Sequence, residues 1–278
     1  MKLKSFAKVN LNLRVKKKNK DNLHNIETIA ALLNLHDEII IKKSNYLKDS
    51  VVVKGKFKKY VNPKKNTILD TLSSLKELGF IKKNYKIVIK KNIPVFAGLG
   101  GGTSNSFFIV KKFYKNEIPE QIKKKFEKKI GSDFRIFLNP WCFQNNISNV
   151  KKFKGCINLH FLLIYPNIKC STKEVYSKVR SFGKFRHINV KKLENRTYLL
   201  KTLKEEKNDL QKIVEKKYPK IKKIINFISI QPNCIFTRMT GSGSVCFGVF
   251  RTKKSAKLAT NMAKKRFPKY WCVTTKSI

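Results

Sequence analysis

A glycine-rich run at residues 94–106, Pro-Val-Phe-Ala-Gly-Leu-Gly-Gly-Gly-Thr-Ser-Asn-Ser, is the part of the chain best suited to chemistry. Glycine has no side chain to hold a ligand away from the backbone, and it adopts positive φ angles without strain. Thr103 and Ser104 stand where cap residues usually open a helix. Because N–H groups gathered at a helix start bind anions, the run favours a phosphate loop over a plain strand-to-helix turn.

Two familiar phosphate-binding patterns do not fit this run. No lysine follows the glycines as in a Walker motif, and the spacing is not that of a dinucleotide-binding fold. The context still supports a ligand site, because residues 85–91 alternate like a strand and residues 106–114 have the apolar spacing of a helix.

Two ionisable residues are candidates for the reaction itself. Asp133 follows Gly131 and precedes an apolar run, where a carboxylate can act as a base if a lysine offsets its charge. Its alternative role is to cap the preceding helix or turn. Lys8, Asn10 and Asn12 share one face of an alternating segment, and that face lines either solvent or a site.

The remaining polar motifs are less specific. The turn Thr240-Gly241-Ser242-Gly243-Ser244 fits a second anion loop as well as a tight connection between strands. His24 lies in a polar loop, where a surface histidine is the default. The four histidines and six cysteines form no metal-like spacing, so we expect reduced cysteines and no metal cluster.

The chain has 278 residues and a formal net charge of +46, which first suggests a nucleic-acid partner. Its lysines are spread over the whole length, however, and aromatic residues do not gather beside them as stacking platforms. We therefore favour lysine enrichment of solvated faces, with attraction of anionic substrates as its consequence. No apolar run has membrane-spanning length and residues 1–12 lack a signal-peptide core, so we expect a cytoplasmic protein.

The elements that must position these residues follow from periodicity and caps. Strands are expected at 3–15, 26–35, 37–43, 50–57, 85–91, 161–165, 235–239, 245–250 and 271–275. Helices are expected at 66–78, 106–114, 119–130, 172–180, 190–204, 210–230 (with a new helix at Pro219) and 253–266. Composition changes between 139 and 158, which predicts two domains, 1–150 and 151–278.

Together these motifs resemble the GHMP small-molecule kinases. Residues 94–106 are similar to the phosphate loop of that family, 131–133 to its catalytic aspartate motif and 240–243 to its C-terminal glycine motif. Residues 7–11, 21–24 and 37–39 resemble the N-terminal signature of one branch of the family. The resemblance implies an α+β fold of two domains, the first like domain 2 of ribosomal protein S5 and the second ferredoxin-like, with the active site in the cleft between them.

The resemblance also implies an activity, namely phosphoryl transfer from ATP to the 2-hydroxyl of a cytidine diphosphate-linked methylerythritol, a step in making isoprenoids. Asp133 would accept the hydroxyl proton, and Lys8 would stabilise that carboxylate and the developing alkoxide. Mg²⁺ would accompany ATP, reached by Ser104 or Thr103. The implied ATP-binding residues are Asn66, Val95, Phe96, Ala97, Gly98, Leu99, Gly100, Gly101, Gly102, Thr103, Ser104 and Asn105; the implied substrate-binding residues are Asn10, His24, Thr172, Tyr176, Gly241 and Ser242.

The sequence departs from the family pattern at three places and leaves rival functions open. Leu23 replaces a tyrosine that covers the cytosine, Arg135 replaces a proline, and residues 144–150 lack a glycine-glutamate motif. One rival is a kinase of the same family that acts on mevalonate or homoserine. The other is a basic RNA-binding protein of similar fold, although we do not expect a nucleic-acid partner. A monomer or a homodimer is expected.

Overall fold

The computed structural model describes residues 1–18, 24–114, 116–155, 158–182 and 188–278. The chain forms two compact units. The first unit comprises residues 1–8, 35–95 and 100–138, and the second comprises residues 9–34, 96–99 and 139–278. Strands β1 (Lys2–Asn10) and β3 (His24–Ser44) contribute residues to both units. The predicted domain boundary at residue 150 stays a prediction.

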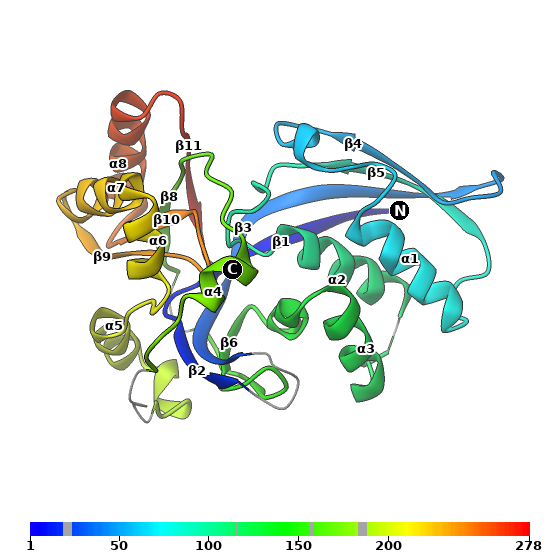
Figure 1. The fold of residues 1–278 in the computed structure, drawn as a ribbon, viewed down its shortest axis with the longest axis horizontal. Coiled ribbons are helices and arrows are strands. Elements are labelled where there is room, and N and C mark those ends of the chain that lie inside the picture. The colour runs from blue at the N-terminus through cyan, green and yellow to red at the C-terminus, as the bar shows by residue number, and fades with distance from the viewer. Residues whose placement is uncertain (19–23, 115, 156–157, 183–187) are drawn as a thin grey trace. The chain divides into compact units, whose positions relative to one another are not determined.

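The first unit is a sheet covered by helices on one face. In its sheet, β5 (Asn84–Lys90) pairs antiparallel with the end of β3 and parallel with β4 (Ser50–Lys54). Helices α1 (Thr67–Glu77), α2 (Gly101–Phe113) and α3 (Glu120–Ile130) lie along one face of these strands (Figure 1). The alternation of buried Ile87 and Ile89 with exposed Lys86 and Lys90 on β5 explains why one face is covered.

The ends of these helices carry the predicted signals, with one exception. Asn66 caps α1, since its side chain accepts hydrogen bonds from the N–H groups of Ile68 and Leu69, and Gly131 ends α3, as predicted. The start of α2 is a correction. The helix begins at Gly101 within the glycine run, not at Thr103 and Ser104, because Gly100 turns the chain at φ 67° and its carbonyl accepts the first helical bond from Ser104 N.

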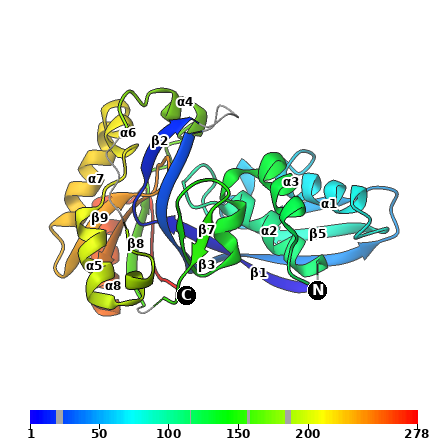
Figure 2. The ribbon, with the colours of Figure 1, turned by 90° about the horizontal axis from the view of Figure 1, so that it is seen from below.

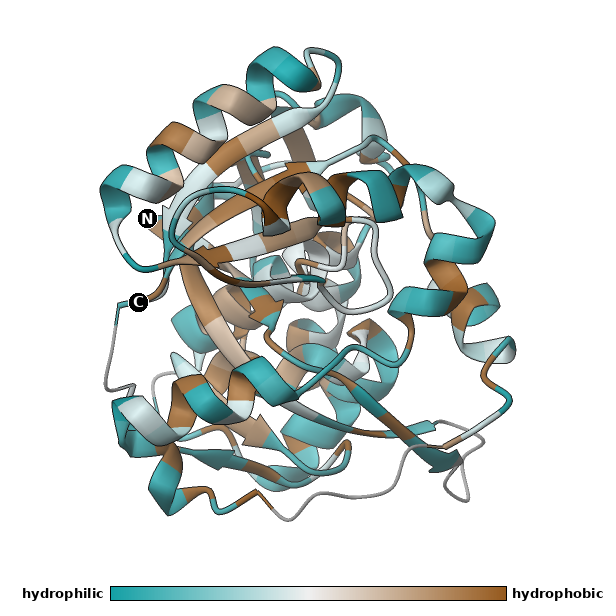
Figure 3. Cartoon of the chain, turned by 90° about the vertical axis from the view of Figure 1, so that its left-hand side faces the viewer, coloured by the Kyte–Doolittle hydropathy of each residue, from teal (hydrophilic) through white to brown (hydrophobic). Residues whose placement is uncertain are grey.

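The second unit contains a four-stranded antiparallel sheet in the order β11-β8-β10-β9. Its strands are β8 (His160–Tyr165), β9 (Cys234–Met239), β10 (Cys246–Phe250) and β11 (Trp271–Lys276). Helices α7 (Pro219–Ser229) and α8 (Lys253–Arg266) pack on one face of this sheet (Figure 2). Their buried rows, such as Ile221 and Ile224 on α7, fill the core. Colouring by hydropathy shows brown strands and extensive teal on the helices (Figure 3).

Shorter elements complete the second unit. They are β2 (Arg14–Lys18), β6 (Trp141–Gln144), β7 (Val150–Lys152), α4 (Thr172–Ser177), α5 (Arg196–Glu205), α6 (Gln211–Lys217) and the 3₁₀ helix η3 (Lys191–Glu194); the first unit has the 3₁₀ helices η1 (Lys58–Tyr60) and η2 (Ser132–Leu138). Strands β2 and β6 both pair antiparallel with β3. Among the described residues, no helix is long and apolar enough to cross a membrane.

Several predicted boundaries change. The expected strand 3–15 is interrupted after Asn10, where Leu13 instead bridges to Asn208, and the two strands expected at 26–35 and 37–43 are the single strand β3. The helix expected at 172–180 ends at Ser177. The segment at 139–158 contains β6 and β7, which we missed because both strands are short. Strand β6 pairs with the distant β3, and β7 pairs with β6 across a short hairpin.

Candidate active site

The centre of the candidate site is an ion pair in the first unit. Lys8 Nζ on β1 lies 2.9 Å from Asp133 Oδ2 in η2. The lysine side chain is 4% exposed and the aspartate side chain 28% exposed. A buried cation is costly unless it is paired, so the aspartate compensates Lys8 while its carboxylate stays open to an incoming group. The structure thus brings together the two residues that the sequence selected separately.

Asp133 is held in place by the apolar residue that follows it. The chain leaves α3 at Gly131, whose carbonyl accepts a hydrogen bond from Phe134 N. The buried ring of Phe134 stacks on Phe126 at 5.4 Å between centroids and meets Phe107 edge-on at 5.2 Å. Because this ring is fixed between α2 and α3, the neighbouring carboxylate is aimed at Lys8 rather than left to cap a helix.

The glycine loop approaches the same ion pair. At Gly100, a Cβ atom would lie 3.0 Å from Lys8 Cγ and 3.0 Å from Phe137 Cζ, so the loop reaches Lys8 only because this residue lacks a side chain. The N–H groups of Gly101, Gly102 and Thr103 donate no hydrogen bond within the described part of the chain. Unsatisfied N–H groups at the start of α2 can therefore bind an anion beside Lys8.

The next two residues, Ser104 and Asn105, make hydrogen bonds inside the first unit. Ser104 is fully buried; its hydroxyl donates to Phe6 O at 2.6 Å and lies 2.7 Å from Ser5 Oγ. Asn105 Nδ2 donates to Ser5 Oγ and to Asp37 Oδ2, each at 2.9 Å. To bind magnesium as predicted, the Ser104 hydroxyl would have to break its hydrogen bond with the carbonyl of Phe6 on β1.

A second buried ion pair, which the sequence reasoning missed, supports the loop. Lys91, at the end of β5, pairs with Asp37 of β3, and their side chains are 4% and 0% exposed. Asp37 Oδ1 also accepts from Asn92 N at 2.8 Å and Ile93 N at 2.9 Å, while Lys91 Nζ donates to Asn105 Oδ1 at 3.2 Å. This network ties the segment before the loop to α2. The sequence signal that could have revealed this pair is Asp37 itself, a charged residue within the largely apolar strand β3.

In the second unit, residues 96–99 pack on the glycine turn at 240–244. A Cβ atom at Gly98 would lie only 2.3 Å from Thr240 O, and Val245 N donates to Ala97 O at 3.2 Å. Asn10 N donates to Thr240 Oγ1 at 3.0 Å. The two glycine motifs, which are more than 130 residues apart, therefore meet through Gly98, and the role of the turn in a ligand site stays a prediction.

Four of the six predicted substrate-binding residues form two pairs in the second unit. The rings of His24 and Tyr176 stack with 5.6 Å between centroids and 28° between planes. Thr172 Oγ1 lies 2.9 Å from Ser242 Oγ. Phe182, which the sequence reasoning did not select, lies 5.9 Å from His24. Leu23, the departure noted in the sequence, is outside the described residues.

Two other residues that were predicted to bind ligands use their side chains in hydrogen bonds within the protein. Asn10 is buried, and its Nδ2 donates to Thr28 Oγ1 at 3.0 Å. Asn66 uses its side-chain oxygen to cap α1 and its Nδ2 to donate to Asn62 O at 2.9 Å. Their roles toward ligands stay predictions.

The ion pairs of Arg135 give a structural reason for an arginine where the family commonly has a proline. Its guanidinium pairs with Glu120 and with Glu127 Oε1, both on α3, the latter at 2.5 Å. The hydrogen bond from Arg135 lowers the pKa of Glu120 to about 2, whereas burial raises the pKa of Glu127. The pair fastens η2 to α3, a structural task compatible with an active Asp133.

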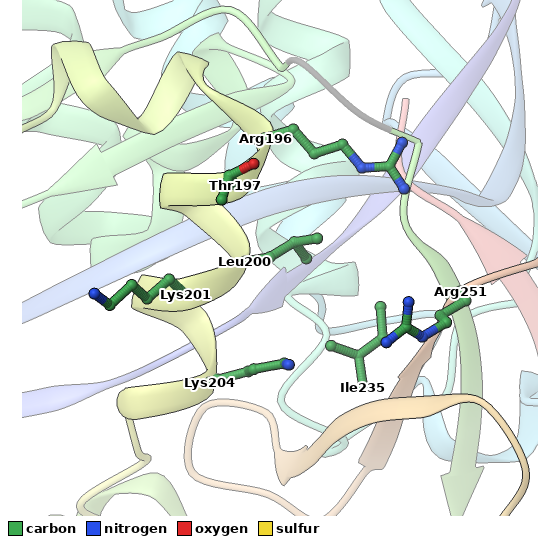
Figure 4. Close-up of a pocket in the computed structure, with 7 residues that line it drawn as sticks. All are labelled: Arg196, Thr197, Leu200, Lys201, Lys204, Ile235 and Arg251. Carbon is green, nitrogen blue, oxygen red and sulfur yellow. The ribbon is translucent and has the colours of Figure 1, made fainter.

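A separate hollow in the second unit lacks the groups for catalysis. It measures about 340 Å³ and is lined by cations of α5 and the end of β10 around a small apolar floor (Figure 4). The cations are Arg196, Lys201, Lys204 and Arg251, and the floor is formed by Leu200 and Ile235. With no carboxylate in its lining this hollow offers no base, and Lys8 and Asp133 stay the predicted catalytic residues.

Comparisons with known proteins identify the family of the chain. Residues 189–269 match the family described as GHMP kinases C terminal. A 4-diphosphocytidyl-2-C-methyl-D-erythritol kinase of Pelagibacter ubique is 39% identical over 100% of this chain and 99% of that protein, and one of Wolbachia pipientis wMel is 31% identical over 99% and 98%.

Solved structures show the same fold. A 4-(cytidine 5'-diphospho)-2C-methyl-D-erythritol kinase has a TM-score of 0.77 with 21% identity, and both chains are covered completely. Homoserine kinase from Cytophaga hutchinsonii has a TM-score of 0.71 with 15% identity, over 100% of this chain and 94% of that one. At these identities the structures support the architecture alone, whereas the sequence relatives define the family.

Proposed function

This chain belongs to the GHMP kinases, in the branch of the 4-diphosphocytidyl-2-C-methyl-D-erythritol kinases, and on that basis we propose how its residues carry the reaction. The reaction is transfer of a phosphoryl group from ATP to the 2-hydroxyl of the cytidine diphosphate-linked methylerythritol, in the methylerythritol phosphate route to isoprenoids. The observation that carries the proposal is the Lys8–Asp133 pair beside the free N–H groups of residues 101–103. We further propose a cytoplasmic enzyme that acts as a monomer or a homodimer.

Asp133 is the proposed base. Its part-exposed carboxylate accepts the proton of the acceptor hydroxyl as the oxygen attacks the phosphorus. Lys8 Nζ, held 2.9 Å from that carboxylate, is placed to stabilise the negative charge that develops on the attacking oxygen. Since Lys8 is buried and paired, it is fixed before substrate binds, and little reorganisation is needed during the reaction.

The phosphates of ATP are assigned to the start of α2. Backbone N–H groups of residues 101–103 point to one region, and the positive end of the helix dipole adds to them. Gly98, Gly100 and Gly101 allow this approach, since a Cβ at each would meet a neighbouring atom at 3.0 Å or less. Val95, Phe96, Ala97 and Leu99 complete the proposed loop.

The residues present fit magnesium held mainly by ATP. Mg²⁺ is usually bound by one or two protein oxygens together with substrate phosphates and water. In the described part of the chain no group of three or more His, Cys, Asp or Glu residues could hold a metal ion. The protein oxygens proposed for the ion are the Thr103 hydroxyl, in the first turn of α2, and Asp133, and Thr103 is preferred to Ser104 because the Ser104 hydroxyl is bonded to Phe6 O. Bound there, the ion would neutralise phosphate charge.

The acceptor is assigned to the second unit. The stacked rings of His24 and Tyr176 offer a platform for a planar base, and the Thr172–Ser242 pair with Gly241 offers hydrogen-bonding groups nearby. This platform favours a cytidine-containing acceptor over mevalonate or homoserine, which have no ring to stack. None of the seven residues that line the hollow in Figure 4 is aromatic, so its cations have no side chain beside them on which RNA bases could stack. RNA binding at this hollow is therefore not favoured.

The test is ATP consumption by the purified protein with the cytidylylated methylerythritol, mevalonate or homoserine as acceptor. We expect turnover with the first acceptor and a loss of about 10²–10⁴-fold in Asp133→Asn. Asp70→Asn, an equal charge change at an exposed position on α1, is the matched control and should retain activity. Preference for an acceptor without cytidine would reject the substrate, and an active Asp133→Asn enzyme would reject the mechanism.

A further inference from the structure

Phe96 has a backbone conformation that a large side chain rarely adopts. Its φ is 59°, and its side chain is 53% exposed. A bulky residue at positive φ is strained, and such strain concentrates at functional positions. The exposed ring gains little from core burial to offset that strain. A role for the ring in binding would explain why the loop holds it there.

A lysine lies over this ring. Lys169 Nζ is 5.7 Å from the centroid of Phe96, within the range of a cation–π contact. The segment that carries Lys169 is fixed on both sides: Ile168 O accepts from Ser244 Oγ at 2.5 Å, and Thr172 Oγ1 lies 2.9 Å from Ser242 Oγ. Residues 96–99, 168–172 and 240–245 therefore form one wall of the second unit, and the ammonium group belongs to it.

The order of groups along this wall matches one class of ligand. Tyr176, which stacks on His24, follows Thr172 by four residues on α4, a rise of about 6 Å. Lys169 precedes Thr172 by three residues. The segment thus presents a cation, then a hydroxyl pair, then an aromatic pair. A nucleoside diphosphate presents the complementary order of diphosphate, ribose and base.

We propose that Lys169, held over the Phe96 ring, binds the diphosphate of the cytidine diphosphate-linked acceptor and sets specificity for an acceptor that carries a diphosphate. Phe96 is a positioning residue, since its ring orients the ammonium group and itself carries no charge. The inference rests on the proposed function. It assigns Phe96 a side-chain role toward the acceptor in addition to its backbone role in the ATP loop.

Binding measurements on the whole chain test the lysine without relying on turnover. The probes are cytidine and cytidine 5′-diphosphate, titrated into wild type, Lys169→Gln and the control Lys173→Gln, an exposed lysine on α4 with the same charge change. We expect Lys169→Gln to bind the diphosphate about tenfold more weakly, the scale of one charge-assisted hydrogen bond, with cytidine affinity unchanged. Equal affinities for the diphosphate in Lys169→Gln and Lys173→Gln would overturn the proposal.

Kinetics separate the two substrates. We expect Lys169→Gln to raise KM for the acceptor about tenfold at saturating ATP, with little change in KM for ATP or in kcat, and Lys169→Arg to recover part of the loss. A rise confined to KM for ATP would place the lysine on the other substrate. If the wild type does not turn over the acceptor at all, the proposed function fails, a result distinct from an unaltered Lys169→Gln enzyme.

Two substitutions of Phe96 distinguish the ring from the strain. Phe96→Ala and Phe96→Gly both remove the ring, but only glycine relieves the positive φ. We expect both variants to raise KM for the acceptor by a similar, severalfold factor, while Phe96→Gly unfolds at the higher urea concentration. An unchanged KM in both variants would show that the exposed ring has no part in acceptor binding.

Discussion

Gly98 and Gly79 form a matched pair for testing how closely residues 96–99 pack on the glycine turn. Both have φ of +75°, so alanine at either position suffers the same backbone strain. Their surroundings differ. A Cβ at Gly98 would lie 2.3 Å from Thr240 O and 3.2 Å from Gly243 O, whereas a Cβ at Gly79 would have no neighbour within 4 Å. The difference between the two alanine variants isolates the contact with the turn.

The structure sets the magnitudes. Left-handed backbone costs an alanine about 1–2 kcal/mol, and Gly79→Ala should lose no more than that. At Gly98, relief of the overlap with a backbone oxygen requires a shift of about 1 Å in residues that are themselves buried, and such overpacking costs about 1–3 kcal/mol. Gly98→Ala should therefore lose about 2–5 kcal/mol of unfolding free energy in all.

The assays are urea denaturation and steady-state kinetics of both variants beside the wild type. Gly79→Ala should keep its kcat/KM, because Gly79 follows α1 away from the loop and turn. Gly98→Ala should lower kcat/KM by at least tenfold, since a displacement of about 1 Å in a substrate-positioning segment can cost up to about 10²-fold. Equal losses of stability and unchanged activity in the two variants would refute the close packing of Gly98 on Thr240.

Two further predictions concern the charges of the first unit. Lys8→Ala should lower kcat by about 10²-fold or more while acceptor KM changes little, because Lys8 acts as charge develops; kcat and KM measured separately decide this, and an unchanged kcat would refute the role. Glu120 has its folded pKa lowered from 4.5 to about 2 by Arg135, so its contribution to stability should be fully present above pH 4.5 and be lost as the pH falls toward 2. Unfolding of wild type and Glu120→Gln between pH 2.5 and 7 measures this contribution, and a stability difference that is independent of pH would contradict it.

Local signals were sufficient for elements whose ends are coded within a few residues. The helix at 253–266 has its predicted bounds, and its start is fixed by Thr252, which caps it. Asn66 likewise caps the helix expected at 66–78, which spans residues 67–77. Pro219 opened a new helix, as its fixed φ and missing N–H predict. In each case one side chain next to the backbone determines the boundary.

Partners far apart in the chain had no such signal. Lys8 was proposed as the cation that matches Asp133, but no local pattern showed that the two residues are in contact. The pairing of Lys91 with Asp37, more than 50 residues apart, was not foreseen, although it supports the loop. Residue types and spacing report what a side chain can do, whereas the choice of partner depends on how β1, β3 and α2 pack.

The polar face predicted for residues 3–15 shows how that packing decides between two meanings of one pattern. Alternation predicted that Lys8, Asn10 and Asn12 share a face but allowed that face to be solvated. All three are at most 3% exposed. A buried polar group is destabilising unless its hydrogen bonds are made, so each needs its own partner.

The partners of Lys8, on β1, and of Asn12, two residues beyond the end of β1, give the two residues different tasks. Lys8 pairs with Asp133 in the first unit, which leaves a charged group at the proposed reaction centre. In the second unit, Asn12 Oδ1 accepts from Ile29 N at 2.6 Å and Asn12 Nδ2 donates to Glu206 at 2.9 Å, so its amide is fully committed to structure. An apolar substitution at Asn12 would strand the buried N–H of Ile29 and remove one hydrogen bond from Glu206, which keeps its ion pair with Arg14. One at Lys8 would take the cation away from the part-exposed Asp133. The same alternating face thus contains one residue whose loss should mainly affect catalysis and another whose loss should mainly affect folding.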